Sequence, residues 1–228
     1  MQTLPMLNRT ARYRPIVGLL RRHRVRGGAV LEIGSGAFGI GEYYDAPFVG
    51  CDLHFDQRPR APLRPVVGSG LRLPFRDATF DAVVVSDVLE HVPASERRAV
   101  VREALRVTST IAVFGFPAGE AALVIDRNLA ALHHARGLAP PTWLLEHLEM
   151  GFPREDILDD LPSGWRCERF GNESLQWHEW IVRREMRRMW RIAFGIVLTV
   201  APGVVQWLLR WTDRPPCYRQ LCVVVRDL

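Results

Sequence analysis

Lysine is missing from this chain of 228 residues, and all 30 basic side chains are arginine. They outnumber the 25 acidic side chains and give a formal net charge of +5. Such uniform use of arginine is more typical of a codon-composition bias than of selection for phosphate contacts. The charge alone therefore does not predict a nucleic-acid-binding surface.

Cysteine is scarce, and no two cysteines have the C-x-x-C spacing of a redox or zinc site. The four are Cys51, Cys167, Cys217 and Cys222. This pattern favours reduced thiols in the cytosol. The N-terminus also lacks the continuous apolar segment of a secretory signal, and we find no repeat or low-complexity segment. We therefore expect a cytoplasmic protein with a single domain over residues 1–228.

Apolar runs and helical patterns alternate along the first half of the chain. Hydrophobic residues make up 48% and charged residues 24%, which is typical of a globular protein. The alternation predicts an α/β fold, with a parallel sheet covered by helices on both faces. We expect strands at 29–33, 48–52, 65–67, 80–86 and 111–116, and helices at 11–24, 39–46 and 94–107.

A glycine-rich loop follows the first apolar run directly. Gly34 suits a tight turn, Gly36 lets a ligand approach the backbone, and Gly39 lets the next helix pack closely on the strand. Free N–H groups at such a helix start attract a carboxylate or phosphate. The G-x-G-x-x-G pattern is weak alone, and a plain strand-to-helix turn is the alternative.

A carboxylate ends the second expected strand. Asp52 lies 20 residues beyond Glu32, which precedes the glycine loop. At the carboxyl end of a neighbouring strand, such an acid can accept both ribose hydroxyls of a nucleoside. The alternative is a solvated acid without a ligand.

These segments together resemble the class I S-adenosylmethionine-dependent methyltransferases, of the bacterial small-molecule and glycan type (methyltransferase domain 11-like). The resemblance implies a Rossmann-like, seven-stranded, mostly parallel sheet with an antiparallel last strand and helical insertions after strands five and six. It covers roughly residues 28–117 and rests on the order of Glu32-x-Gly34-x-Gly36-x-x-Gly39, Gly50-x-Asp52, Gly68 through Leu73-Pro74-Phe75, Phe80-Asp81 and Leu89-Glu90-His91.

The resemblance also implies S-adenosyl-L-methionine as the cofactor and a role for each matching position. The methionine part of the cofactor would lie beside Glu32, Gly34, Ser35, Gly36 and Gly39, and its ribose would lie on Asp52. The adenine would lie beside Leu53, Ser69, Gly70 and Leu71, and the sulfonium beside Ser86 and Asp87. Ser69 departs from the family, which usually has Asp there. An NAD-binding Rossmann protein shares the glycines and Asp52, but it does not explain Leu73-Pro74-Phe75 followed by Phe80-Asp81.

Two chemical roles are open for the segment after the fourth strand. Transfer to a hydroxyl needs a base, and His91 is the predicted catalytic base, with Glu90 orienting it. The alternative is that both residues brace the loop. Asp87-x-x-Glu90-His91 also resembles the ligand pattern of some metal-assisted O-methyltransferases, with His133, His134 or His147 as further ligands. No metal is assigned from the sequence.

Residues 117–163 are expected to form the roof of the acceptor pocket. Helices are predicted at 119–136, 141–150 and 153–160. The candidate lining residues are His133, His134, Trp143, Glu146 and His147. A helix surface with incidental polar groups is an equally good reading of any one of them.

An apolar helical excursion, residues 172–214, is expected between strands at 164–170 and 217–226. Its first helix is predicted at 175–191, and Pro202-Gly203 interrupts the apolar run 192–209. A single membrane crossing would separate the last strand from its sheet, so we expect none. The region 175–212 could instead dip into the inner face of a membrane, or form a lid or a homodimer contact.

The predicted function is methyl transfer from S-adenosylmethionine, at oxygen, to a small-molecule, glycan or lipid-linked acceptor. Nucleic acid is not an expected partner, because no aromatic and basic platform occurs outside the excursion. The alternative of a different class is a non-catalytic cofactor-binding or membrane-associated scaffold.

Overall fold

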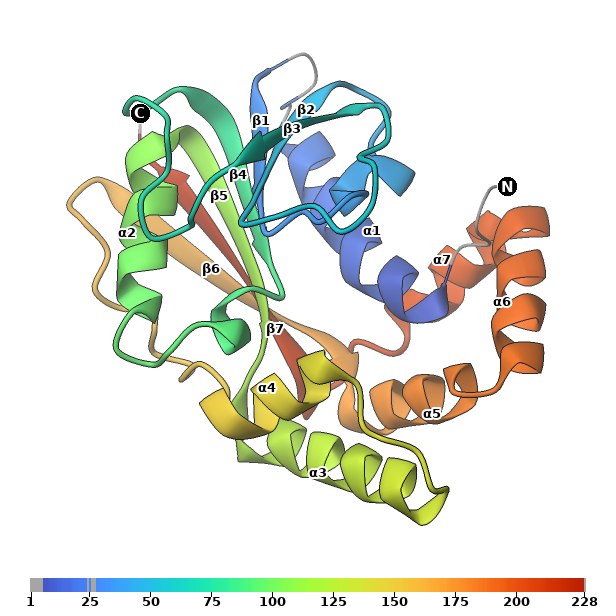
Figure 1. The fold of residues 1–228 in the computed structure, drawn as a ribbon. Coiled ribbons are helices and arrows are strands. Elements are labelled where there is room, and N and C mark those ends of the chain that lie inside the picture. The colour runs from blue at the N-terminus through green and yellow to red at the C-terminus, as the bar shows by residue number, and fades with distance from the viewer. Residues whose placement is uncertain (1–5, 24, 26–27, 228) are drawn as a thin grey trace.

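The computed structural model describes residues 6–23, 25 and 28–227. Its centre is one seven-stranded sheet with the order β3-β2-β1-β4-β5-β7-β6 (Figure 1). The first five strands are parallel, and β7 runs antiparallel to both neighbours, which confirms the predicted fold class. The strands are β1 (Val30–Ile33), β2 (Phe48–Asp52), β3 (Leu63–Val67), β4 (Phe80–Ser86), β5 (Thr108–Pro117), β6 (Trp165–Ser174) and β7 (Cys217–Arg226).

Helices cover both faces of the sheet, and further helices lie beyond one end of its strands (Figure 1). They are α1 (Leu7–Arg22), the 3₁₀ turns η1 (Gly39–Glu42) and η2 (Leu89–His91), α2 (Arg97–Val107), α3 (Gly119–Ala135), α4 (Thr142–Met150), α5 (Leu175–Glu185), α6 (Arg188–Val200) and α7 (Pro202–Arg210). The predicted insertions after the fifth and sixth strands are α3–α4 and α5–α7.

The core explains why β4 is a continuous apolar run. Alternate side chains of a strand point to opposite faces of its sheet. Val83 and Val85 pack in the cluster that contains the apolar side of α2, whereas Ala82 and Val84 pack in the cluster of α1. Because both faces are covered, residues 82–85 of β4 are apolar on both faces.

The helical excursion packs against the beginning of α1. Leu7 and Ala11 share a buried apolar cluster with Ile181, Leu198 and Val205. Figure 1 shows α5, α6 and α7 beside α1, while α3 and α4 lie together past the end of β5. No helix among the described residues is long and apolar enough to cross a membrane.

Three predicted helices differ from the structure. The helix predicted at 153–160 is a series of turns, in which Leu158 is buried between Pro153 and Pro162. Its aspartates favour turns over helix, since their side chains compete for backbone groups. The helix predicted at 39–46 is the single 3₁₀ turn η1, which ends at Glu42 and is followed by Tyr43 with φ −127° and ψ −11°.

The helix predicted at 175–191 is two helices, α5 and α6. The chain is extended at Arg187, with φ −100° and ψ 124°. The break follows Glu185, whose carboxylate accepts a hydrogen bond of 2.8 Å from the Leu7 amide at the start of α1. This contact satisfies an N–H group that no helical carbonyl can reach.

Candidate active site

Two glycines of the loop after β1 are required by packing inside the protein. Gly34 has φ +71°, and a Cβ there would lie 2.4 Å from Val88 Cγ2. Gly39 has φ +47°, and a Cβ would lie 2.0 Å from Glu32 Oε2. A side chain at either position would clash in addition to adopting a disfavoured backbone conformation.

Gly36 differs, because a Cβ there would meet nothing within 4 Å. Its amide donates a hydrogen bond of 2.7 Å to Asp52 Oδ2 at the end of β2. The neighbouring Ser35 is buried, and its hydroxyl donates to the Gly36 carbonyl at 3.0 Å. The loop therefore presents open space directly beside a carboxylate, whose other oxygen accepts no hydrogen bond from the described part of the chain.

Glu32 braces the glycine loop from inside the protein. Its side chain is fully buried, and Oε2 accepts a hydrogen bond of 2.7 Å from the Ile40 amide. Burial raises the pKa of Glu32 to about 8. The other oxygen, Oε1, has no hydrogen-bond partner among the described residues. The observed contact is thus with η1 and not with the open side of Gly36.

Exposed apolar side chains gather at the carboxyl ends of β2 and β3. Leu53 is 66% exposed, Val67 69% and Leu71 38%. Val67 lies opposite Asp52 in the sheet. The loop that carries Ser69 and Gly70 is held in place, since Ser69 Oγ accepts from the Leu71 amide at 3.2 Å and Gly70 packs on β1. These side chains form an apolar border around Asp52.

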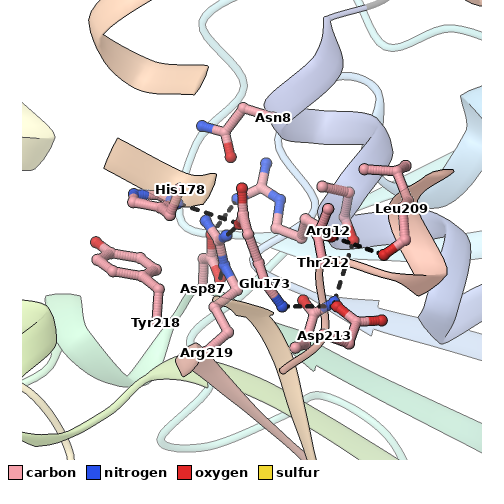
Figure 2. Close-up of polar contacts among 12 residues, drawn as sticks. Asn8, Arg12, Asp87, Glu173, His178, Leu209, Thr212, Asp213, Tyr218 and Arg219 are labelled. Carbon is pink, nitrogen blue, oxygen red and sulfur yellow. Dashed lines mark hydrogen bonds and ion pairs between the residues drawn. The ribbon is translucent and has the colours of Figure 1, made fainter. Parts of the chain in front are cut away.

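Asp87 lies between two arginines from distant elements (Figure 2). Arg12 Nη1 of α1 donates to Asp87 Oδ2 at 2.5 Å, and Arg219 Nη2 of β7 donates to the same oxygen at 3.1 Å. Burial alone would raise the pKa of Asp87, but the charges of Arg219 and Arg12 hold it well below its usual range. Asp87 also has φ +50°, a conformation that Asp adopts more readily than most residues.

The ion pairs continue away from Asp87 into a buried network (Figure 2). Arg219 also pairs with Glu173, and His178 Nδ1 lies 3.1 Å from Glu173 Oε2. The His178 ring stacks on Tyr218 with centroids 3.4 Å apart. Ser86, the residue before Asp87, is buried, and its hydroxyl has no partner among the described residues.

His91 is oriented by a carboxylate other than the predicted one. Its Nδ1 lies 2.6 Å from Glu146 Oε2 on α4. Because a carboxylate only accepts hydrogen bonds, this contact assigns the proton to Nδ1 and leaves the Nε2 lone pair free. Burial and the neighbouring His147 lower the pKa of His91.

Glu90 makes no hydrogen bond to His91. It is fully buried, and neither carboxylate oxygen has a partner among the described residues. His147 Nε2 lies 4.0 Å from Glu90 Oε1. Burial and the charge of Asp87 raise the pKa of Glu90 well above its usual value.

The residues predicted to line the roof divide into two groups. Glu146 and His147 come together with Glu90 and His91 because α4 packs on η2, and the edge of Trp143 contacts His147. His134 is exposed on α3, and His133 Nδ1 bonds the Leu129 carbonyl at 2.9 Å. The structure therefore selects His147 from the three histidines that the sequence offered.

Several residues of this region escaped the sequence analysis. Arg12, Arg219 and Asp126 are the main ones, and Asp126 accepts hydrogen bonds from both Tyr218 and His147. One feature of the sequence could have identified Asp126. It is a carboxylate on the apolar face of a predicted helix, between Ile125 and Leu129. Such a residue is rarely buried without a partner.

A hollow of about 240 Å³ lies elsewhere, between α1, β6 and the connection from α7 to β7. Its lining residues are Ala11, Arg14, Pro15, Gly18, Asn172, Leu209, Thr212 and Asp213. None of the predicted cofactor-binding residues belongs to this lining, so we do not assign the reaction to it.

A family model described as a methyltransferase domain matches residues 31–114. This segment begins in β1, contains the glycine loop and Asp52, and ends in β5. No curated protein sequence matches the chain significantly.

Solved structures with a similar fold cover nearly the whole chain. One is the plantazolicin methyltransferase BpumL in complex with a monoazolic desmethylPZN analog and SAH, with a TM-score of 0.60, 11% identity, and 97% of this chain and 85% of that chain covered. Another is a putative sarcosine dimethylglycine methyltransferase from Galdieria sulphuraria, with a TM-score of 0.54, 14% identity, and coverages of 93% and 82%.

A third is a putative methyltransferase in complex with the Trm112 activator of Haloferax volcanii, with a TM-score of 0.52, 13% identity, and coverages of 97% and 98%. At such low identities these likenesses support the fold. The family model supplies the activity, and it argues against the NAD-binding alternative. The chain therefore carries a methyltransferase domain at 31–114, within a seven-stranded, mostly parallel sheet of the kind predicted from the sequence.

Proposed function

We propose that S-adenosylmethionine binds across the glycine loop, with its ribose on Asp52, and that its methyl group passes to an acceptor oxygen. The observation that carries this proposal is the open space at Gly36 beside the Asp52 carboxylate. Gly34 and Gly39 are needed for packing within the protein. Gly36 also has a positive φ, +53°, which favours glycine, and the open space beside it leaves room for a ligand to approach the backbone.

The borders of this space suit the parts of the donor. The free oxygen of Asp52 can accept ribose hydroxyls, and the apolar side chains of Leu53, Val67 and Leu71 offer surface to an adenine ring. Residues 34–36 would pass beside the methionine part. Ser86 and Asp87, at the carboxyl end of β4, would lie toward the sulfonium and the acceptor.

We assign the segments of the single domain accordingly. Residues 28–117 would bind the donor, and residues 117–163 would form the roof over the acceptor. Methyl transfer is an in-line displacement: the acceptor oxygen forms the new bond to carbon as the bond from carbon to sulfur breaks. The protein contributes alignment and exclusion of water. If no metal ion occupies His91, this residue would act as the general base and accept the proton of the acceptor hydroxyl.

The acceptor class is inferred from the surface of α6 and α7. Ile196, Val200, Val204 and Trp207 are exposed there by 51%, 78%, 57% and 58%. Exposed apolar patches of this kind mark interaction surfaces. We therefore favour an amphiphilic or lipid-linked acceptor, met at the inner face of a membrane, over a freely diffusing polar one.

The donor site is tested by titrating S-adenosylhomocysteine into the full chain in a calorimeter. The wild type should bind, and Asp52→Asn should bind about 10- to 100-fold more weakly, because it loses charge-assisted hydrogen bonds to the ribose. Asparagine still offers an oxygen to the Gly36 amide, so the loop should keep its conformation.

Asp56→Asn is the matched control, since Asp56 is an exposed carboxylate four residues along the same loop. It should leave the affinity unchanged. Wild type that does not bind S-adenosylhomocysteine, or Asp52→Asn that binds as the wild type does, would contradict the donor site proposed here.

A further inference from the structure

We propose that Glu90, His91 and His147 bind a divalent transition-metal ion at the acceptor side of the pocket. Each of these residues offers one ligand atom, and the three atoms lie within 4.8 Å of one another. Glu90 and His91 come from η2 after β4, and His147 comes from α4 of the roof. The site therefore joins the donor-binding core to the acceptor insertion.

The spacing of the three atoms is close to that of a metal site. Ligand atoms about 2.1 Å from a tetrahedral Zn²⁺ are separated by about 3.4 Å. Glu90 Oε1 and His147 Nε2 are 4.0 Å apart. A small side-chain movement would bring them onto one ion.

Glu90 supplies an independent reason to expect a cation. Its side chain is 0% exposed, and both oxygens lack a hydrogen-bond partner among the described residues. A buried carboxylate without a hydrogen-bond partner is costly. The nearby Arg97 does not serve it, because Arg97 donates to the backbone carbonyls of Val92, Met150 and Gly151.

Both histidines are oriented as metal-binding histidines usually are. His147 Nδ1 lies 2.6 Å from Asp126 Oδ2, and His91 Nδ1 lies 2.6 Å from Glu146 Oε2. Each carboxylate holds the proton on Nδ1 and leaves the Nε2 lone pair for a ligand. Asp126 is itself held by the Tyr218 hydroxyl at 2.9 Å. Packing alone does not explain why two oriented imidazoles lie beside a carboxylate that has no hydrogen-bond partner among the described residues. A bound cation would explain this arrangement.

The donor set indicates the class of ion. Two imidazoles and one carboxylate suit Zn²⁺, Mn²⁺, Co²⁺ or Fe²⁺, whereas Mg²⁺ and Ca²⁺ prefer all-oxygen sets. Three protein ligands leave coordination positions open. The use of these positions for an acceptor oxygen rests on the proposed function, but the binding of the ion does not. A bound ion would occupy the His91 lone pair, so this role and the role of general base exclude each other.

The test is a titration of the full chain, stripped of metals, with Co²⁺ followed by its visible absorption. Binding of one Co²⁺ per chain with a spectrum of low coordination number is expected, and Zn²⁺ should displace it. Glu90→Gln, which is nearly isosteric, and His147→Ala should each abolish the stoichiometric spectrum. Asp126→Asn should weaken binding about 10- to 100-fold.

His134→Ala is the matched control, because His134 is an exposed roof histidine outside the cluster. It should bind Co²⁺ as the wild type does. The proposal is wrong if the folded wild type takes up no stoichiometric Co²⁺ or Zn²⁺, or if Glu90→Gln binds them with unchanged affinity. Circular dichroism confirms folding, and the conservative Glu90→Gln decides the matter if His147→Ala does not fold.

The same preparations separate this site from the donor site. S-adenosylhomocysteine binding without any metal uptake would overturn the metal site alone. Stoichiometric metal uptake without S-adenosylhomocysteine binding would support the metal site and contradict the proposed function.

Discussion

At the scale of single residues, Glu32 shows how one side chain constrains its neighbours. Its carboxylate fills the space where a side chain at position 39 would lie, and it accepts a hydrogen bond from the Ile40 amide. Glycine at 39 is thus a consequence of a buried carboxyl, as well as of a ligand-binding motif.

The same residue should make stability depend on pH. Burial raises the pKa of Glu32 from an ordinary 4.5 to about 8 in the folded protein. A raised folded-state pKa means that the contribution to stability is present at low pH and is lost as the pH rises through 8. Between about pH 5 and pH 8, the wild type should lose up to about 1.4 kcal/mol per pH unit relative to Glu32→Gln.

Urea unfolding of both proteins across that range measures this difference. A gap between wild type and Glu32→Gln that stays constant from pH 5 to pH 8 would show that Glu32 is ionised in the folded protein. The pH dependence common to both proteins reports other groups, so only the difference is interpreted.

At the scale of elements, α6 and α7 expose a coherent apolar face. Ile192, Ile196 and Val200 recur every four residues along α6 and therefore share one side of that helix. Arg187, Arg188 and Arg191 are exposed at its beginning. An apolar face beside arginines is typical of helices that lie at the surface of an anionic bilayer.

We therefore expect the protein to sediment with anionic liposomes. Changing both Ile196 and Trp207 to Ser should lower the partition constant for liposomes at least about tenfold. Each apolar side chain that is buried in the membrane contributes about 1.5 to 3 kcal/mol to the free energy of binding. The matched control changes Val124 and Leu138 to Ser, since these are exposed apolar residues on and after α3.

Sedimentation velocity without lipid distinguishes a dimer contact from a membrane surface. Equal liposome binding by wild type and the Ile196 and Trp207 double variant would contradict the membrane proposal. A dimer that the same double variant dissociates would assign the face to a second copy of the chain.

At the scale of the whole molecule, the Asp87 network connects parts of the chain that are far apart in sequence. Arg12 is 75 residues from Asp87, and Arg219 is 132 residues away. Through Glu173 and His178 the network also includes β6 and α5. It therefore holds α1 and the helical excursion onto the carboxyl end of the sheet.

Asp87→Asn should destabilise the protein by about 3 kcal/mol, because two largely buried arginines lose their shared counter-charge. Asparagine tolerates the positive φ at this position, so backbone strain would not explain the loss. Denaturant unfolding measures the change.

Asp77→Asn is the control, since Asp77 pairs with Arg106 at the surface and its side chain is 79% exposed. Loss of such a pair should change stability by at most about 1 kcal/mol. If Asp87→Asn changed stability no more than this control, the network would not be an important source of stability.

The sequence predicted the strands well because each signal is local. The apolar run Phe80–Ser86 and the glycines after Ile33 identify a buried strand and a loop without knowledge of their neighbours. Helix boundaries were less well predicted. The helix break before α6 follows Glu185, which bonds the distant Leu7 amide, and such a contact between distant residues has no local sequence signal.

By itself, the sequence determined the class of fold, the glycine loop and the carboxylate of Asp52 at a strand end, since period and spacing are encoded in neighbouring residues. Only the tertiary structure decided that Glu146 orients His91, that two arginines surround Asp87, and that His147 faces Glu90. The physical reason is that charge and hydrogen-bond partners act over a few ångströms in space. The packing of α4 and β7 on the sheet decides which of many charged side chains come within that range.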